Sequence, residues 1–294
     1  MRFVQLALCL LLPLLFTLAG CKPKYMCSET LPTITGNPNA FVGENGETRL
    51  IVAAKNGNAC LVEALISEGA DVNQANNEGV TPLDFACALR HVESIKVLLN
   101  YGANVNQADN QGRPTIFAAV DDSPEVIKLL LNNGADVNQA NNEGGTPLYR
   151  AVVNSYIEAV KILLENGADV NQVRADGVTY LHHALIKQNI DLIKVLLENG
   201  AYVNQVRPDG ATPLIVAVSL GNNAILKTLL DNGANVNQAF GKDVTPLHVA
   251  SYNGNAEAVK MLLAYGADKS LITGIGLSAY DVAKNNRIKA LLKP

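Results

Sequence analysis

The chain has few of the residues on which catalytic and metal sites depend. Its 294 residues include no tryptophan, four histidines and five cysteines, and aromatic residues make up 5% of the total. No nucleophile elbow, phosphate-binding loop or dinucleotide-binding glycine motif occurs. The nearest approach to a metal-ligand cluster is Cys60, Cys87 and His91, and its cysteines lie too far apart for a zinc motif. The sequence therefore predicts no enzymatic activity, no cofactor and no metal.

Glycine, in contrast, recurs at regular intervals. The five-residue phrase Gly-Ala-Asp-Val-Asn begins at Gly69 and returns with small changes at Gly102, Gly134, Gly167, Gly200, Gly233 and Gly266. The spacing is 33 residues, apart from one interval of 32 between Gly102 and Gly134. A fixed period of this size is typical of repeat proteins, in which each unit buries its apolar face against its neighbours.

A second phrase, Thr-Pro-Leu, follows twelve residues after several of these glycines, at Thr81, Thr146, Thr212 and Thr245. Threonine can cap the first turn of a helix, and proline at the next position has a preset backbone angle and no amide hydrogen to leave unpaired. Runs such as Ile95, Val97, Leu98 and Leu99 then predict a second, half-buried helix, which the glycine of the first phrase ends. Each unit is therefore expected to hold two helices.

The two phrases together resemble the ankyrin repeat, most closely where Thr245-Pro246-Leu247 continues as His248-Val249-Ala250. The resemblance covers about residues 43 to 294. It implies an all-α repeat protein, an ankyrin solenoid of about eight helix-turn-helix units joined by short β-turn or hairpin loops. The expected boundaries are seven repeats at 43–75, 76–108, 109–140, 141–173, 174–206, 207–239 and 240–272, and a polar C-terminal capping repeat at 273–294.

The third unit departs most from the pattern. Arg113-Pro114-Thr115 inverts threonine and proline, and one residue is missing near Asp121 to Pro124. Loss of a helix cap typically costs about 1 kcal/mol, so this unit is a candidate weak point. Either it is tolerated variation among eight units, or it is a functional hinge.

The amino terminus resembles the signal of a bacterial lipoprotein. An apolar stretch from Phe3 to Leu18, too short for a stable membrane span, precedes Leu18-Ala19-Gly20-Cys21. The resemblance implies a signal peptide at 1–20, lipidation of Cys21 with palmitate-type acyl chains, and a lipidated tether at 21–42. The expected location is the periplasmic side of the bacterial outer membrane, held by lipid alone. Two alternatives are an ordinary signal peptide with a coincidental cysteine, and a cytosolic form that starts at Met26.

Three cysteines would remain beyond the lipidated one. An oxidising periplasm permits one disulfide among Cys27, Cys60 and Cys87, all of which lie in the tether or the first two units. The alternative is that these are buried structural thiols. The sequence does not decide between them.

The family resemblance also indicates where a ligand would bind. In ankyrin proteins, contacts usually come from the turn tips and from two positions at the end of the first helix, on the concave face. The concave-face positions are Leu89, Asp121, Asp122, Val153, Asn154, Ile186, Lys187, Leu220, Tyr252 and Asn253. The turn-tip positions are Glu78, Val80, Asn110, Arg113, Glu143, Arg174, Arg207, Phe240 and Lys242. The alternative is that these side chains pack locally against adjacent helices.

Charge is unevenly distributed along the chain. Residues 22–143 hold 8 basic and 15 acidic residues, and residues 144–294 hold 14 basic and 12 acidic residues. The acidic first half argues against a nucleic-acid partner. We expect a non-catalytic protein-binding lipoprotein that is a monomer when unbound, and most specifically an immunity protein that neutralises an antibacterial effector such as a secreted lipase. The alternatives are a periplasmic scaffold in oxidative or envelope stress protection and, third, an enzyme or metal carrier.

Overall fold

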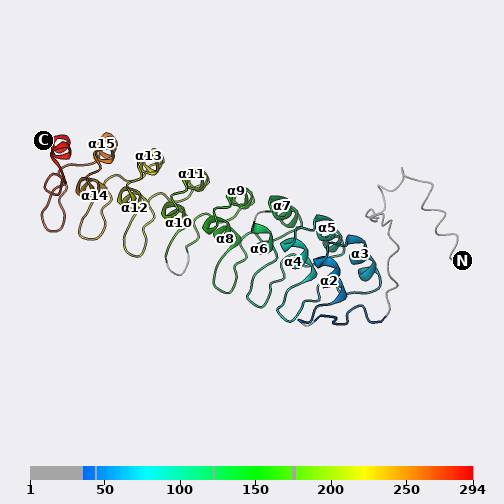
Figure 1. Ribbon diagram of the computed structural model, residues 1–294. Helices are drawn as coiled ribbons and strands as arrows, with labels where there is room; N and C mark the ends of the chain where they lie inside the picture. The colour runs from blue at the N-terminus through cyan, green and yellow to red at the C-terminus, as the bar shows by residue number, and fades with distance from the viewer. Residues whose placement is uncertain (1–35, 44, 122, 174–176, 294) are drawn as a thin grey trace, which may run out of the picture. The chain divides into compact units, whose positions relative to one another are not determined.

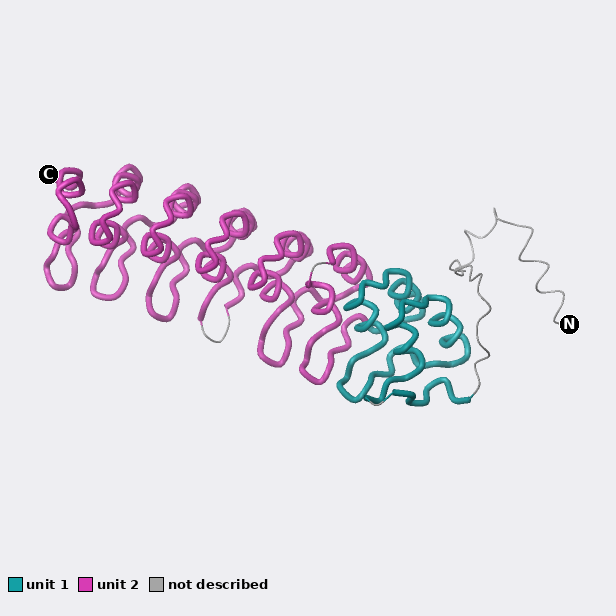
Figure 2. Tube along the Cα trace, in the orientation of Figure 1, with its two compact units in different colours: residues 1–104 teal, residues 105–294 magenta. Residues whose placement is uncertain are grey.

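The computed structural model describes residues 36–43, 45–121, 123–173 and 177–293. Within these ranges the chain forms fifteen α-helices, α2 to α16, and no β-strand (Figure 1). Its extended pairings are isolated bridges in the loops, such as Phe240 with Val244 and Ile272 with Ser278. The expected all-α repeat fold is confirmed. The described residues belong to two compact units, one within residues 1–104 and one within residues 105–294 (Figure 2).

Unit 1 contains two helix pairs. The first helices of the pairs pack on each other, and each second helix packs against its own first helix and against the other second helix. The four helices are α2 (Arg49–Lys55), α3 (Ala59–Ser67), α4 (Pro82–Ala88) and α5 (Val92–Asn100).

Unit 2 contains five helix pairs and a final helix. Its first helices stand side by side in one row, its second helices form another row, and the loops between pairs extend to one side (Figure 1). The first helices are α6 (Ile116–Val120), α8 (Pro147–Val153), α10 (Tyr180–Ile186), α12 (Pro213–Leu220) and α14 (Pro246–Asn253). The second helices are α7 (Pro124–Asn132), α9 (Ile157–Glu165), α11 (Ile190–Glu198), α13 (Asn223–Asp231) and α15 (Ala256–Ala264), and the chain ends with α16 (Asn286–Leu292).

Threonine caps most first helices, as the sequence predicts. The Thr146 side chain accepts a hydrogen bond from the Tyr149 amide, and Pro147 is the first helical residue. The same cap forms at Thr48, Thr81, Thr179, Thr212 and Thr245. Because this cap satisfies an otherwise unpaired amide, it fixes where each first helix begins.

The asparagine of the recurring phrase joins consecutive repeats. In unit 2, Asn171 Nδ2 donates to the Gly200 carbonyl at 2.9 Å, and its Oδ1 accepts from the Tyr202 amide at 2.8 Å. The same pair of bonds forms at Asn106, Asn138, Asn204 and Asn237. Each loop is therefore held to the next repeat by one side chain.

The core consists of small and aliphatic residues. The first helices bury an alanine at the same position, Ala86 in unit 1 and Ala151, Ala184, Ala217 and Ala250 in unit 2. Small side chains let neighbouring helices approach closely, while leucine, isoleucine and valine of the second helices fill the space behind them. This packing explains why the chain needs so few aromatic residues.

The third repeat is shortened where the sequence departs from the pattern. Thr115 has a helical backbone and its side chain caps nothing, and α6 has five residues where the other first helices of unit 2 have seven or eight. The last repeat also differs, because Ser278 to Asp281 form turns in place of a first helix. Only its second helix, α16, is present.

Candidate binding surface

The ends of the first helices in unit 2 expose apolar side chains. Ile186 ends α10 with 55% of its surface exposed, Leu220 ends α12, and Tyr252 lies in the last turn of α14 with 71% exposed. We define the first-helix face by the predicted residues at these ends: Val153, Asn154, Ile186, Lys187, Leu220, Tyr252 and Asn253. Because α8, α10, α12 and α14 are consecutive neighbours, these residues share one side of unit 2.

Most residues of the first-helix face are accessible. Asn154, Lys187 and Asn253 are exposed, whereas Val153 is half-buried. A residue with positive φ turns the chain from each first helix into the second helix, at Ser155, Gln188, Gly221 and Gly254. In unit 1, Leu89 takes the same position after α4 and is 49% exposed.

Asp121, which the sequence places among the binding residues, is engaged within unit 2. Its carboxylate accepts a hydrogen bond from Arg150 Nε at 2.7 Å and forms an ion pair with the Arg150 Nη2 atom. The hydrogen bond raises the pKa of the Arg150 guanidinium. Asp121 thus links the end of α6 to α8. Asp122 lies outside the described residues.

The predicted turn-tip residues fall into two groups. Some are held by the loops: Arg113 pairs with Asp109 at 2.6 Å, Arg207 pairs with Asp209 at 3.0 Å, and Phe240 and Val80 are half-buried. The exposed tip residues are Glu78, Asn110, Glu143 and Lys242. Glu78 accepts a hydrogen bond from Asn45 within unit 1. Arg174 lies outside the described residues.

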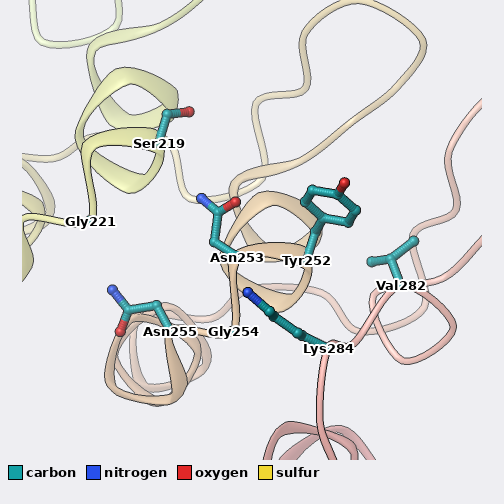
Figure 3. Close-up of a pocket in the computed structure, with 8 residues that line it drawn as sticks. All are labelled: Ser219, Gly221, Tyr252, Asn253, Gly254, Asn255, Val282 and Lys284. Atoms are coloured by element: carbon teal, nitrogen blue, oxygen red, sulfur yellow. The ribbon is translucent and has the colours of Figure 1, made fainter.

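Two hollows flank Tyr252 at the C-terminal end of unit 2. One, of about 350 Å³, has mostly apolar walls and is lined by the loop before α14, by α14 itself and by loop 273–277, with Tyr252 and Val282 among its lining residues. The other, of about 610 Å³, is bordered by Ser219, Asn253, Asn255 and Lys284. Figure 3 shows the Tyr252 ring standing clear of α14, with Val282 to one side and Asn253 to the other. Tyr252 is therefore shared by both hollows.

His248 holds the wall of the smaller hollow in place. The Thr245 amide donates to His248 Nδ1 at 3.2 Å, so Nε2 carries the proton and donates to the Leu277 carbonyl at 3.1 Å. The Gly274 amide also donates to the Lys242 carbonyl. Loop 273–277, which carries Ile275 and Leu277, is thus tied to α14 and to the preceding loop.

The sequence did not predict the contribution of the last repeat. Leu277 lies at the surface, and Ile275 is 70% exposed at a loop position where other units carry polar residues such as Glu78, Glu143, Asp209 and Lys242. That local reversal of polarity was the available signal. Lys284 was equally missed, because it reaches this surface only by packing its stem over Gly254.

Comparison with known proteins identifies the family. The model of ankyrin repeats (3 copies) matches residues 15–109, 107–174 and 181–273, which together cover most of the chain. The chain is an ankyrin-repeat protein. A 41-residue segment of this ankyrin protein is also 56% identical to part of the regulatory protein SWI6 of Kluyveromyces lactis. That segment is 14% of the ankyrin chain and 5% of SWI6, so the match spans a small part of the relative.

Two histidines of the ankyrin protein, His182 and His248, are buried within its repeats. His182 is fully buried, and its Nδ1 atom lies 2.8 Å from the Thr179 hydroxyl. Burial, helped by the charge of Arg207, lowers the pKa of His182 to about 4. Burial also lowers the pKa of His248. Among the described residues no group of three or more histidine, cysteine or acidic side chains could hold a metal ion.

Two of the three cysteines considered for a disulfide lie in the described part of the ankyrin protein. Cys87 is a free thiol buried in α4, and burial raises its pKa well above the usual value. Cys60 is disulfide-bonded. Cys27 and the lipidation candidate Cys21 lie outside the described residues. No helix in the described part of the chain is long and apolar enough to span a bilayer.

Proposed function

We propose that this ankyrin protein acts by stoichiometric binding of another protein to the first-helix face. Ankyrin repeats imply protein binding in general. The observation that carries the assignment to this face is the exposure of Ile186, Leu220 and Tyr252 along neighbouring helix ends. Contiguous exposed apolar surface usually marks an interaction site, and large side chains at its centre contribute most of the binding energy.

Affinity capture with a double variant tests this surface. We expect Ile186→Ser combined with Tyr252→Ser to abolish capture of the partner that the unchanged protein retains from envelope extracts. The matched control is Tyr202→Ser combined with Tyr265→Ser, two exposed residues that follow second helices. Equal loss in both variants, or no loss in the first, would remove the first-helix face from the proposal.

The proposed location is the periplasmic side of a bacterial outer membrane. The support is the apolar stretch from Phe3 to Leu18 followed by Leu-Ala-Gly-Cys at 18–21. Several acyl chains on Cys21 would anchor the protein firmly, since each buried methylene contributes about 0.8 kcal/mol. Growth with an alkyne-tagged fatty acid should label the unchanged protein and leave Cys21→Ser unlabelled. Labelling of both would refute the assignment of Cys21.

The proposed biological role is immunity against an antibacterial effector, such as a secreted lipase. Confinement at a membrane raises the concentration of a binder at the surface that such an effector attacks. The experiment is co-expression of the ankyrin protein with an effector encoded beside it. Survival that depends on Tyr252 and Ile186 supports the role. A neighbouring catalase or respiratory gene cluster, with no toxic effector, would favour the stress-protection scaffold.

A further inference from the structure

We infer that the surface around Tyr252 binds a protein segment in which one aromatic or aliphatic side chain lies between acidic residues. This inference rests on the proposed protein-binding function and specifies the chemistry of the partner. It concerns unit 2 alone, where the last repeat meets α14. Two independent features carry it, the shape of the apolar hollow and the distribution of charge around it.

The apolar hollow has room for one large side chain. Its volume of about 350 Å³ is lined by the apolar residues Val244, Val249, Leu277 and Val282 and by the strongly exposed Tyr252 and Ile275. Tyr252 and Ile275 are among the most exposed large apolar residues of the described chain. Covering them removes apolar surface from water, so an aromatic or branched aliphatic group is the favoured occupant.

A lysine borders each of the two hollows that meet at Tyr252. Lys242 lines the smaller hollow, and Lys284 lines the larger one beside Asn253 and Asn255. The Lys284 side chain crosses Gly254, where an added Cβ would lie 2.9 Å from its Cδ atom (Figure 3). Neither lysine forms an ion pair with any described residue. Two lysines that form no ion pair therefore flank the exposed tyrosine.

Three of the four acidic side chains of the same region are engaged within the chain. Glu257 pairs with Lys260 and Arg287, Asp281 accepts from the Ser278 hydroxyl, and Asp268 accepts from the Ser270 hydroxyl. The fourth, Asp243, follows Lys242 and lines neither hollow, but its Oδ2 atom lies 3.5 Å from the position of an added Cβ at Gly274, in the loop beside the smaller one. Residues 240–293 hold seven basic and four acidic residues, so the excess positive charge is local. Carboxylates on both sides of an apolar anchor match this pattern.

The surface fits a protein segment better than a nucleic acid. Phosphate backbones are bound by many cations together, whereas here one lysine lines the apolar hollow and a second lines the neighbouring hollow. The larger hollow adds the side-chain amide of Asn253, which can pair with the backbone of an extended peptide, whereas the Asn255 amide caps α15 and donates to Asn223. Nucleic acid and anionic lipid become outcomes of the test.

Selection from a displayed library of random twelve-residue peptides tests the inference on the full chain. We expect enriched sequences with glutamate or aspartate on both sides of an aromatic or aliphatic residue. Synthetic versions should lose at least about tenfold in affinity on Tyr252→Ala, a loss typical of a central anchor. They should lose a similar factor on Lys242→Glu combined with Lys284→Glu, and binding should weaken with added salt.

Matched controls separate this site from charge or tyrosine in general. Lys128→Glu combined with Lys194→Glu makes the same change in net charge on exposed second helices, and Tyr202→Ala removes another exposed tyrosine. Both should bind the peptides unchanged. Enriched peptides that ignore Tyr252 and the two lysines would overturn this inference and leave protein binding elsewhere intact. Failure to enrich any peptide, or tight binding only to anionic vesicles or single-stranded DNA, would also overturn it.

Discussion

Asp121 at the end of α6 and Arg150 in α8 form a bridge between consecutive repeats, with Arg150 Nε donating to a carboxylate oxygen at 2.7 Å. The bridge stands where the third repeat is most irregular. Its first helix has five residues and no side-chain cap. The ion pair therefore supports the repeat that has the weakest local structure.

Replacing Arg150 should weaken this part of the protein first. We expect Arg150→Met, which keeps most of the apolar stem, to lower the free energy of unfolding by about 0.5–1 kcal/mol, since both side chains are partly exposed. Hydrogen exchange should show the loss in the amides of α6 before those of α10. Uniform loss of protection throughout unit 2, or no change at α6, would contradict a local role.

We call the paired hydrogen bonds of Asn171 and its equivalents the asparagine ladder. It predicts a larger loss of stability from a residue in a loop. Asn171→Ala removes two hydrogen bonds between repeats, so the free energy of unfolding measured in urea should fall by about 1–2 kcal/mol. Asn154→Ala is the matched control, because Asn154 bonds through its side chain only to Arg150 of its own helix turn. Equal effects of the two substitutions would show that the ladder adds little.

His182 makes stability depend on pH. Its pKa in the folded protein is about 4, below the usual 6.5. The unfolded chain therefore binds the proton more readily, and the fold loses stability as pH falls from about 6.5 towards 4, by roughly 2–3 kcal/mol. Ile215 fills the same helix position in α12, so His182→Ile should flatten the dependence measured by denaturation between pH 7.5 and 4.5. An unchanged slope would assign the effect to other groups.

Cys87 should be chemically silent in the folded protein. Its thiol is buried and its pKa is raised, so the reactive thiolate is scarce. We expect a thiol reagent at pH 8 to modify Cys87 only after denaturant is added. Leu89→Cys, at an exposed position two residues along, supplies the control and should react at once. Rapid modification of Cys87 in buffer would mean that α4 opens readily.

Most of the fold could be predicted from the sequence because each repeat carries residues that mark the ends of its helices. Threonine caps and glycine turns predicted where helices begin and end, and this held even where Tyr180 replaces the usual proline after Thr179. The third repeat was located as irregular by its inverted Pro114 and Thr115. These features are local, so short-range chemistry is enough to read them.

The candidate site was less predictable because it depends on contacts between distant residues. Ile186, Leu220 and Tyr252 were identified from their place in the repeat, and their exposure agrees with that reading. The pairing of Asp121 with Arg150, 29 residues away, could not be read from spacing. Nor could the meeting of Lys242, Tyr252 and Val282 around one hollow. Side-chain partners across repeats are set by packing, which the period alone does not specify.

Site-specific photo-crosslinking most directly tests whether the first-helix face binds another protein. A benzophenone amino acid at position 252 or 186, introduced in cells that make the protein, should yield one discrete covalent adduct on illumination. The same group at position 202, which is also well exposed but lies on another part of unit 2, should yield none. Adducts at position 202 with none at 252 and 186 would contradict the account.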